Sequence, residues 1–186
     1  YELTSRWGLP LDRMSAVQLF AALATDTGWF RFASTRADTY RLAAALADAG
    51  AVPNRLYQQL YENDSPGRLR LTGRVLSRTE TDLNGRIIYS WIERTDFGTT
   101  GALPSDTEDL INILMTVAGA EVALMFIELV SGGLKVSFRS RSHIDCSQLA
   151  GLFGGGGHRQ AAGAYLADPL PIARQKVLDA VRSAMQ

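Results

Sequence analysis

The sequence is poor in the residues from which disulfides and soft-metal sites are built. It holds one cysteine, Cys146, and two histidines among its 186 residues. A lone cysteine cannot close an internal disulfide, and it excludes a cysteine-rich zinc site. Two histidines cannot supply a histidine-rich metal centre from this chain alone. We interpret Cys146 as a small, partly buried residue near the start of a helix rather than as a catalytic thiol.

An excess of charge and a long apolar run are also missing. Lys and Arg total 19 and Asp and Glu total 19, so the formal net charge is zero. We therefore expect no whole-chain attraction to long duplex DNA. The most apolar stretch, residues 111–130, is interrupted by Gly119, Glu121 and Glu128. It indicates a helix followed by a strand rather than a membrane span. No segment has the pattern of a signal peptide, and we expect a cytoplasmic protein with no membrane partner.

The pattern of apolar residues changes part-way along the chain. Helical periodicity dominates up to residue 62, apart from a short aromatic, strand-like run at residues 29–32. Turn formers at residues 63–67 indicate a boundary, and the alternation from Leu69 to Val75 predicts a strand. Asn84-Gly85 predicts a hairpin. We expect the tail of an α/β domain (1–62), a linker (63–68), and a small α+β domain with a mixed sheet (69–186).

Within the second domain, Asp145 is expected to cap a helix that begins at Cys146. Strands are expected at residues 121–130 and 134–139, joined by a turn at residues 131–133. A final helix is expected after Pro169, with Leu178, Val181 and Met185 on one face.

A glycine run is the strongest local signal. Gly154, Gly155, Gly156 and Gly157 precede His158, and four consecutive glycines lose much conformational entropy on ordering. We expect the run to lie between two helices, where its amide groups and the following helix N-terminus could bind a phosphate. His158 and Arg159 could add side-chain donors there. A flexible surface loop is the alternative.

Two arginines precede this run. In an alternating strand Ser137, Arg139 and Arg141 point to one face. Guanidinium groups bind phosphate oxygens in pairs of hydrogen bonds, so Arg139 and Arg141 are candidate phosphate ligands. Taken alone, the pattern favours a solvated strand edge.

A carboxylate follows the first apolar helix, in Thr25-Asp26-Thr27-Gly28. Asp26 could bind a hard divalent cation. An aspartate that stabilises a turn through its own backbone hydrogen bonds is the alternative, and spacing alone favours it.

Together these segments resemble the DHH phosphoesterase family. The run Phe153 to Gly163 is similar to the glycine–histidine signature of its C-terminal, DHH-associated domain. Residues 137–140 resemble the arginine-bearing strand that precedes this signature. Residues 25–32 resemble the last motif of the N-terminal DHH domain, whose aspartate is a metal ligand. The resemblance extends over essentially the whole chain, and it implies an α/β DHH domain tail followed by a DHH-associated domain.

The resemblance also implies a function. It indicates hydrolysis of phosphate esters in short oligoribonucleotides or 3′-phosphoadenosine 5′-phosphate, with two divalent ions, manganese by expectation, activating water. Asp26 would be a metal ligand. Arg139, Arg141, His158 and the backbone of Gly154, Gly155, Gly156 and Gly157 would bind the substrate phosphate. A cyclic dinucleotide phosphodiesterase and a non-catalytic nucleotide- or RNA-binding module remain open as alternatives.

The Asp-His-His motif of the family is not found in these residues. The chain begins with Tyr1 rather than Met, and we expect the missing motifs to precede it. With one implied metal ligand, Asp26, the chain is expected to be inactive alone. A homodimer is left open.

Overall fold

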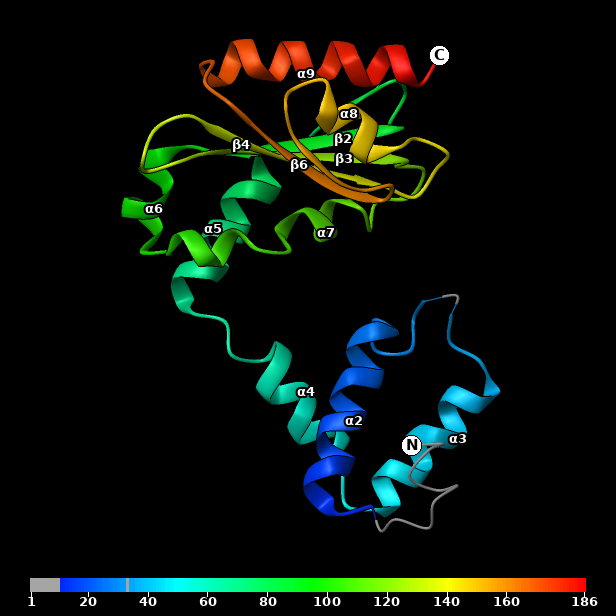
Figure 1. Ribbon diagram of the computed structural model, residues 1–186. Coiled ribbons are helices and arrows are strands. Elements are labelled where there is room, and N and C mark those ends of the chain that lie inside the picture. The colour runs from blue at the N-terminus through cyan, green and yellow to red at the C-terminus, as the bar shows by residue number, and fades with distance from the viewer. Residues whose placement is uncertain (1–10, 33) are drawn as a thin grey trace. The chain divides into compact units, whose positions relative to one another are not determined.

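The computed structural model describes residues 11–32 and 34–186, which divide into a first unit that ends at Asp64 and a second from Ser65 to Gln186. The described part of unit 1 is helical, with α2 (Arg13–Asp26), α3 (Ala37–Asp48) and α4 (Pro53–Tyr61) (Figure 1). The Asp12 carboxylate accepts a hydrogen bond from the Ser15 amide at 2.7 Å and so caps α2. Small and large apolar residues pack the three helices together: Ala16, Phe20, Ala24, Leu46, Ala51 and Leu56.

The segment after α2 is a left-handed turn, so the predicted strand at residues 29–32 is wrong. Gly28, Trp29 and Phe30 have φ angles of 54°, 57° and 66°. The Trp29 amide donates to the carbonyl of Ala24 at 2.6 Å, which ends the helix. The Trp29 ring meets that of Tyr57 edge-on, with centroids 5.0 Å apart. The aromatic residues therefore serve a ring cluster in unit 1 rather than a pleated strand.

Unit 2 is built on a six-stranded mixed sheet with the order β1-β2-β3-β4-β6-β5. β2 and β3 are parallel, and the other neighbouring pairs are antiparallel. The α/β class and the mixed sheet are therefore confirmed. The strands are β1 (Glu80–Asp82), β2 (Ile87–Ile92), β3 (Val122–Glu128), β4 (Leu134–Ser140), β5 (Gly156–His158) and β6 (Ala161–Leu166).

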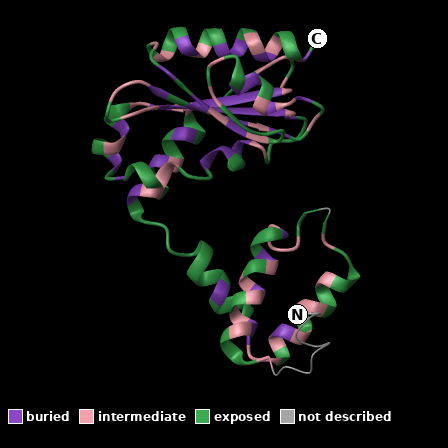
Figure 2. Ribbon diagram, in the orientation of Figure 1, coloured by how far each residue is buried: buried purple, intermediate pink, exposed green. Residues whose placement is uncertain are grey.

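Helices cover both faces of this sheet (Figure 1). On one face lie α8 (Cys146–Gly151) and α9 (Leu170–Ala184), which pack against Val122, Leu124 and Phe126 of β3. On the other lie α5 (Pro66–Ser77), α6 (Arg94–Thr100), the 3-10 turn η1 (Pro104–Thr107) and α7 (Leu110–Leu114). The intervening β3 residues, Ala123, Met125 and Ile127, belong to this second core. Figure 2 shows the central strands buried between the two layers.

Several local predictions are confirmed. Asn84 and Gly85 have positive φ in the β1–β2 hairpin, and the Asp145 carboxylate accepts from the amides of Ser147 and Gln148 at the start of α8. The final helix buries Val177, Leu178 and Val181. No helix within the described residues is both long and apolar enough to cross a bilayer.

The strand predicted from Leu69 to Val75 is wrong, because these residues belong to α5. Ser65 caps this helix by accepting from the Arg68 amide at 2.9 Å, and Pro66 occupies its first turn. The buried residues Leu71 and Val75 are four apart. That spacing satisfies a helix as well as a strand, and the Ser-Pro start decides between them.

The helix expected after the glycine run is also absent from the described residues. Residues 156–158 and 161–166 form the antiparallel pair β5 and β6 instead. The Gly155 amide donates to the Ala150 carbonyl at 2.9 Å, so the run closes the end of α8. Ala162 and Ala164 are buried while Ala161 and Gly163 are less so, which is the period-two pattern of a strand.

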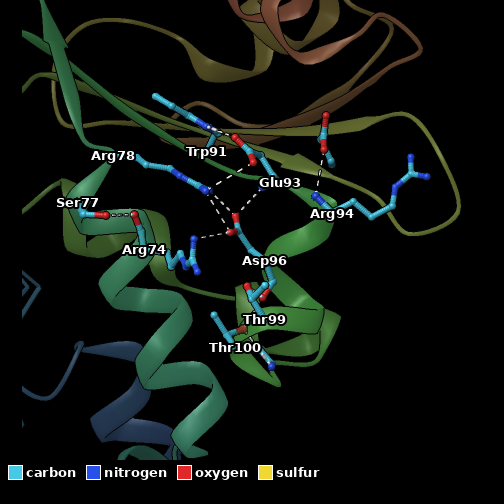
Figure 3. Close-up of polar contacts among 11 residues, drawn as sticks. Arg74, Ser77, Arg78, Trp91, Glu93, Arg94, Asp96, Thr99 and Thr100 are labelled. Atoms are coloured by element: carbon cyan, nitrogen blue, oxygen red, sulfur yellow. Dashed lines mark hydrogen bonds and ion pairs between the residues drawn. The ribbon is translucent and has the colours of Figure 1, made fainter.

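A buried ion pair fixes α6 to α5 (Figure 3). Asp96 is 1% exposed and forms two hydrogen bonds with the guanidinium of Arg78, which raise the pKa of Arg78. Asp96 also accepts from the Glu93 amide at 2.8 Å, which caps α6. Arg74 lies 3.7 Å from the same carboxylate. One side chain therefore joins two helices and a helix start.

We predict that Asp96→Ala lowers the free energy of unfolding of unit 2 by roughly 3 kcal/mol, because it removes both hydrogen bonds between Asp96 and Arg78 and leaves that half-buried guanidinium only the ion pair with Glu93 at 3.6 Å. Asp168→Ala is the matched control, since Asp168 pairs with Lys176 at 2.9 Å on the surface. We expect that change to cost less than about 1 kcal/mol. Denaturant unfolding followed by circular dichroism measures both, and equal losses would contradict the prediction.

Candidate functional site

The register of three strands brings two sequence-predicted residues into one row. Arg139 of β4 pairs with Ala161 of β6, and Ala161 pairs with His158 of β5. Residues that pair directly across neighbouring strands point to the same face of a sheet. The only side chain between Arg139 and His158 is therefore a methyl group. His158 is exposed and Arg139 half-buried, so both present polar groups to that face.

The next row along this face is smaller still. Ser137 pairs with Gly163, and Gly163 pairs with Gly156. Within residues 65–186, the apolar residues of this face that pack under α5 and α7 lie on β2 and β3. None of them lies on β4, β6 or β5. The core of α8 and α9 takes the alternate residues Val136, Phe138 and Ala162. This face of β4, β6 and β5 is therefore a floor of small residues, with Arg139 and His158 at its rim. The floor consists of Ser137, Gly156, Ala161 and Gly163.

The glycines of the run have different structural tasks. A side chain at Gly155 would overlap the Gly163 carbonyl, and one at Gly157 would lie 2.6 Å from the Ala161 carbonyl oxygen. These two positions let β5 approach β6 closely. At Gly156 a methyl group would meet nothing within 4 Å. Its lack of a side chain keeps the open face flat, and no packing contact within the described unit requires it.

The predicted backbone cradle is only partly available. The amides of Gly154 and Gly155 already donate to the carbonyls of Gly151 and Ala150, at 3.1 and 2.9 Å. Gly156 and His158 lie on β5, which is the edge strand of the sheet. An edge strand has amide groups that point away from its neighbour. Backbone donors for an anion are therefore expected from β5 rather than from the turn before it.

A groove of about 340 Å³ runs beside Arg139. Lys135, Ser137 and Arg139 of β4 form one wall, and Glu108 and Asp109 lie on the other. The Arg139 guanidinium uses one nitrogen on the Phe138 carbonyl, at 3.1 Å. A guanidinium has five N–H donors, so several remain for a ligand. The groove can hold a group that carries both anionic and hydroxyl oxygens.

Two other arginines are directed elsewhere. The Arg141 guanidinium donates to the carbonyls of Met115 and Val117, the latter at 3.0 Å, and so holds the end of α7. Arg159 donates to the His143 carbonyl at 3.3 Å and lines a separate cavity beside α8 and α9. The structure therefore gives Arg141 a structural role, whereas Arg139 remains a candidate ligand.

Asp26 is the last residue of α2 in unit 1 and is exposed. The Thr27 hydroxyl beside it donates to the Leu23 carbonyl at 2.7 Å and accepts from the Phe30 amide at 3.1 Å. Thr27 therefore stabilises the turn that the sequence assigned to Asp26. Residues 11–32 and 34–186 contain no group of three or more metal-ligating side chains. The exposed carboxylate suits a hard cation but would be one ligand among several.

Cys146 is buried at the first residue of α8. Burial raises the pKa of its thiol to about 11, and the nearby Arg139 charge opposes that shift. The thiol is therefore protonated at neutral pH, which agrees with its interpretation as a small packing residue.

The comparison with known proteins identifies the family. Residues 84–186 match the family model of the DHHA1 domain, which covers more than half of the chain. The chain belongs to the DHH family. Residues 84–186 are its DHHA1 domain and contain β2 to β6, α8 and α9. The resemblance seen in the glycine–histidine motif is thereby confirmed.

Similar proteins carry enzyme names. The chain is 34% identical to the bifunctional oligoribonuclease and PAP phosphatase NrnA of Thermus thermophilus, over 91% of the chain and 51% of that protein. It is 27% identical to the protein of the same name from Bacillus subtilis, over 86% of the chain and 50% of that protein. The chain thus spans about half the length of these curated relatives.

The fold also matches a solved structure. The crystal structure of an exopolyphosphatase-related protein from Bacteroides fragilis aligns with a TM-score of 0.87 at 24% identity. The match covers 99% of this chain and 54% of that one. At this identity the likeness supports the fold described above.

We predict that Gly155→Ala destabilises the DHHA1 domain, whereas Gly156→Ala changes the open face and leaves the fold intact. Gly155→Ala should lower the free energy of unfolding by roughly 2 kcal/mol, because its methyl group meets the backbone of β6. Gly156→Ala should leave stability unchanged or raise it by up to about 1 kcal/mol. Denaturant titration of both variants measures this. Equal destabilisation would contradict the assigned positions of β5 and β6.

Proposed function

We propose that this chain is part of a divalent-metal-dependent phosphoesterase that acts on short oligoribonucleotides or on 3′-phosphoadenosine 5′-phosphate. The DHHA1 domain would bind a phosphate of the substrate on the face of β4, β6 and β5. The observation that carries this proposal is the row in which Arg139 and His158 flank Ala161. The names of the relatives from Thermus thermophilus and Bacillus subtilis support the substrate class.

The chemistry of the row suits a terminal phosphate. Arg139 can donate two parallel hydrogen bonds to phosphate oxygens, and the His158 ring can donate one from the other side. The flat floor of Ala161, Gly156 and Gly163 lets a sugar or base approach the sheet closely. Held in this way, a substrate loses translational freedom before the reaction, and good positioning can lower a barrier by roughly 7 kcal/mol.

Asp26 is proposed as a metal ligand, completed by residues that the described chain does not supply. A divalent ion, manganese by our expectation and one of two in the whole enzyme, would supply Lewis-acid activation of water and phosphate. The carboxylate oxygen is a ligand type that such ions accept. The role of this chain is then to contribute one carboxylate from unit 1 and the phosphate contacts from the DHHA1 domain.

We predict that Arg139→Ala and His158→Ala each weaken binding of 3′-phosphoadenosine 5′-phosphate by about tenfold or more, the usual effect of losing a charge-assisted hydrogen bond. Isothermal titration calorimetry of the 186-residue chain measures the dissociation constant. Arg159→Ala is the matched control, because Arg159 follows His158 in sequence but contacts the His143 carbonyl. We expect it to bind as the unchanged chain does.

A different pattern of binding losses among the three variants would refute the proposed role of this face. Binding that is lost in Arg159→Ala but kept in Arg139→Ala and His158→Ala would place the phosphate elsewhere. Circular dichroism of each variant confirms that the fold persists.

We also predict that the 186-residue chain does not hydrolyse a diribonucleotide with manganese, because Asp26 alone cannot hold the metal. Release of mononucleotide is followed by ion-exchange chromatography, with chelator as the blank. Metal-dependent turnover well above that blank would show that the 186-residue chain suffices, and would contradict the expectation that most of the metal ligands lie outside it.

A further inference from the structure

A third row lies on the same face as Arg139 and His158. Lys135 of β4 pairs with Tyr165 of β6, two rows beyond Arg139 and Ala161. Both side chains are exposed, and the exposed fraction of Tyr165 is 57%. An aromatic ring and a cation thus adjoin the small-residue floor at the end opposite to Arg139. Tyr165 is not among the site residues predicted from the sequence, because no motif marks it.

The ring of Tyr165 is held in place by the β3–β4 turn. Gly133 has a φ of 78°, and a side chain there would overlap the phenol ring. The ring therefore lies against bare backbone on one side, while more than half of the residue remains open to solvent. A ring positioned in this way is a ready surface for stacking. Proteins that bind single-stranded nucleic acid use such rings to stack bases, with little dependence on sequence.

The spacing separates this row from the proposed phosphate site. Lys135 and Arg139 are four positions apart in β4, so their Cα atoms lie roughly 13 Å apart. Strand side chains stand roughly perpendicular to the sheet, and in that arrangement a single phosphate does not reach both charged ends. Between them lie Ser137 and Gly163, which leave the face open. A ligand that uses both ends must be longer than one phosphate.

The residues on the opposite wall of the groove limit which ligands suit it. Glu108 and Asp109 line it together with Lys135 and Arg139. Carboxylates repel a continuous chain of phosphates but accept hydrogen bonds from ribose hydroxyls. A groove with cations on one wall and carboxylates on the other therefore suits alternating phosphate and ribose.

We propose that Tyr165 and Lys135 form a second nucleotide subsite, which binds the nucleotide adjacent to the one held by Arg139 and His158. Tyr165 stacks on the base of that second nucleotide, and Lys135 contacts the phosphate that follows this base, which 3′-phosphoadenosine 5′-phosphate lacks. This inference rests on the proposed function of the face. With this subsite the DHHA1 domain binds a di- or triribonucleotide more tightly than a single nucleotide.

The test compares two ligands on the 186-residue chain by calorimetry: the triribonucleotide pApApA and 3′-phosphoadenosine 5′-phosphate. Tyr165→Leu should weaken pApApA about tenfold, the size expected for one stacked base, and leave the shorter ligand unchanged. Tyr165→Phe keeps the ring and should restore pApApA binding. Lys135→Ala should weaken pApApA alone, whereas Lys176→Ala, which removes a lysine paired with Asp168 on α9, should not.

Two outcomes would overturn the subsite while leaving the proposed function intact. One is that the unchanged chain binds both ligands through Arg139 but Tyr165→Leu affects them equally or not at all. The other is that tripolyphosphate competes as well as pApApA. If the unchanged chain binds neither nucleotide, the proposed function of the face is itself overturned. Circular dichroism of Tyr165→Leu shows whether the fold persists, and Lys135→Ala tests the subsite if it does not.

Discussion

The register that pairs β4 with β6 and β6 with β5 decides what this domain can present to a ligand. Side chains alternate along a strand, so a shift of one residue would exchange the two faces completely. Val136, Phe138, Ala162 and Ala164 point into the core under α8 and α9. Burying these residues therefore forces Arg139, Ala161 and His158 to the opposite face. The geometry of the candidate site is a consequence of core packing and needs no contact between the polar side chains themselves.

Small residues make this register possible. β5 is short and exposed, and edge strands of this kind are held weakly unless they approach their neighbour closely. Gly155 and Gly157 permit that approach, since a side chain at either position would meet the backbone of β6. The amides of Gly154 and Gly155 also close the end of α8. The glycine run thus ties a helix end to an edge strand, and the open floor at Gly156 follows from the same stretch of chain.

The sequence predicts local features well where one residue type has one physical use. Asp145 before a helix and Asn84-Gly85 between strands behaved as their side-chain and backbone preferences require. The prediction from sequence is wrong where the same spacing of apolar residues fits both a strand and a helix. Leu71 and Val75 suit either a strand or a helix, and only the start at Ser65 and Pro66 separates the two. The aromatic run at residues 29–32 fails for another reason: its rings pack in a cluster with α4, and that contact depends on tertiary structure.

The glycine run shows how such an error affects function. A phosphate bound by a helix N-terminus would depend on aligned amides. The structure instead has a strand edge at this position, and in the proposed function the side chains Arg139 and His158 are the main donors while the backbone contributes less. A strand also extends the face, because every second residue of β6 joins it, up to Tyr165. Zero net charge does not exclude a local anion site. In the proposed function Lys135 and Arg139 on β4 supply the positive charge, and Glu108 and Asp109 across the groove would favour a ligand that carries hydroxyls as well as phosphates.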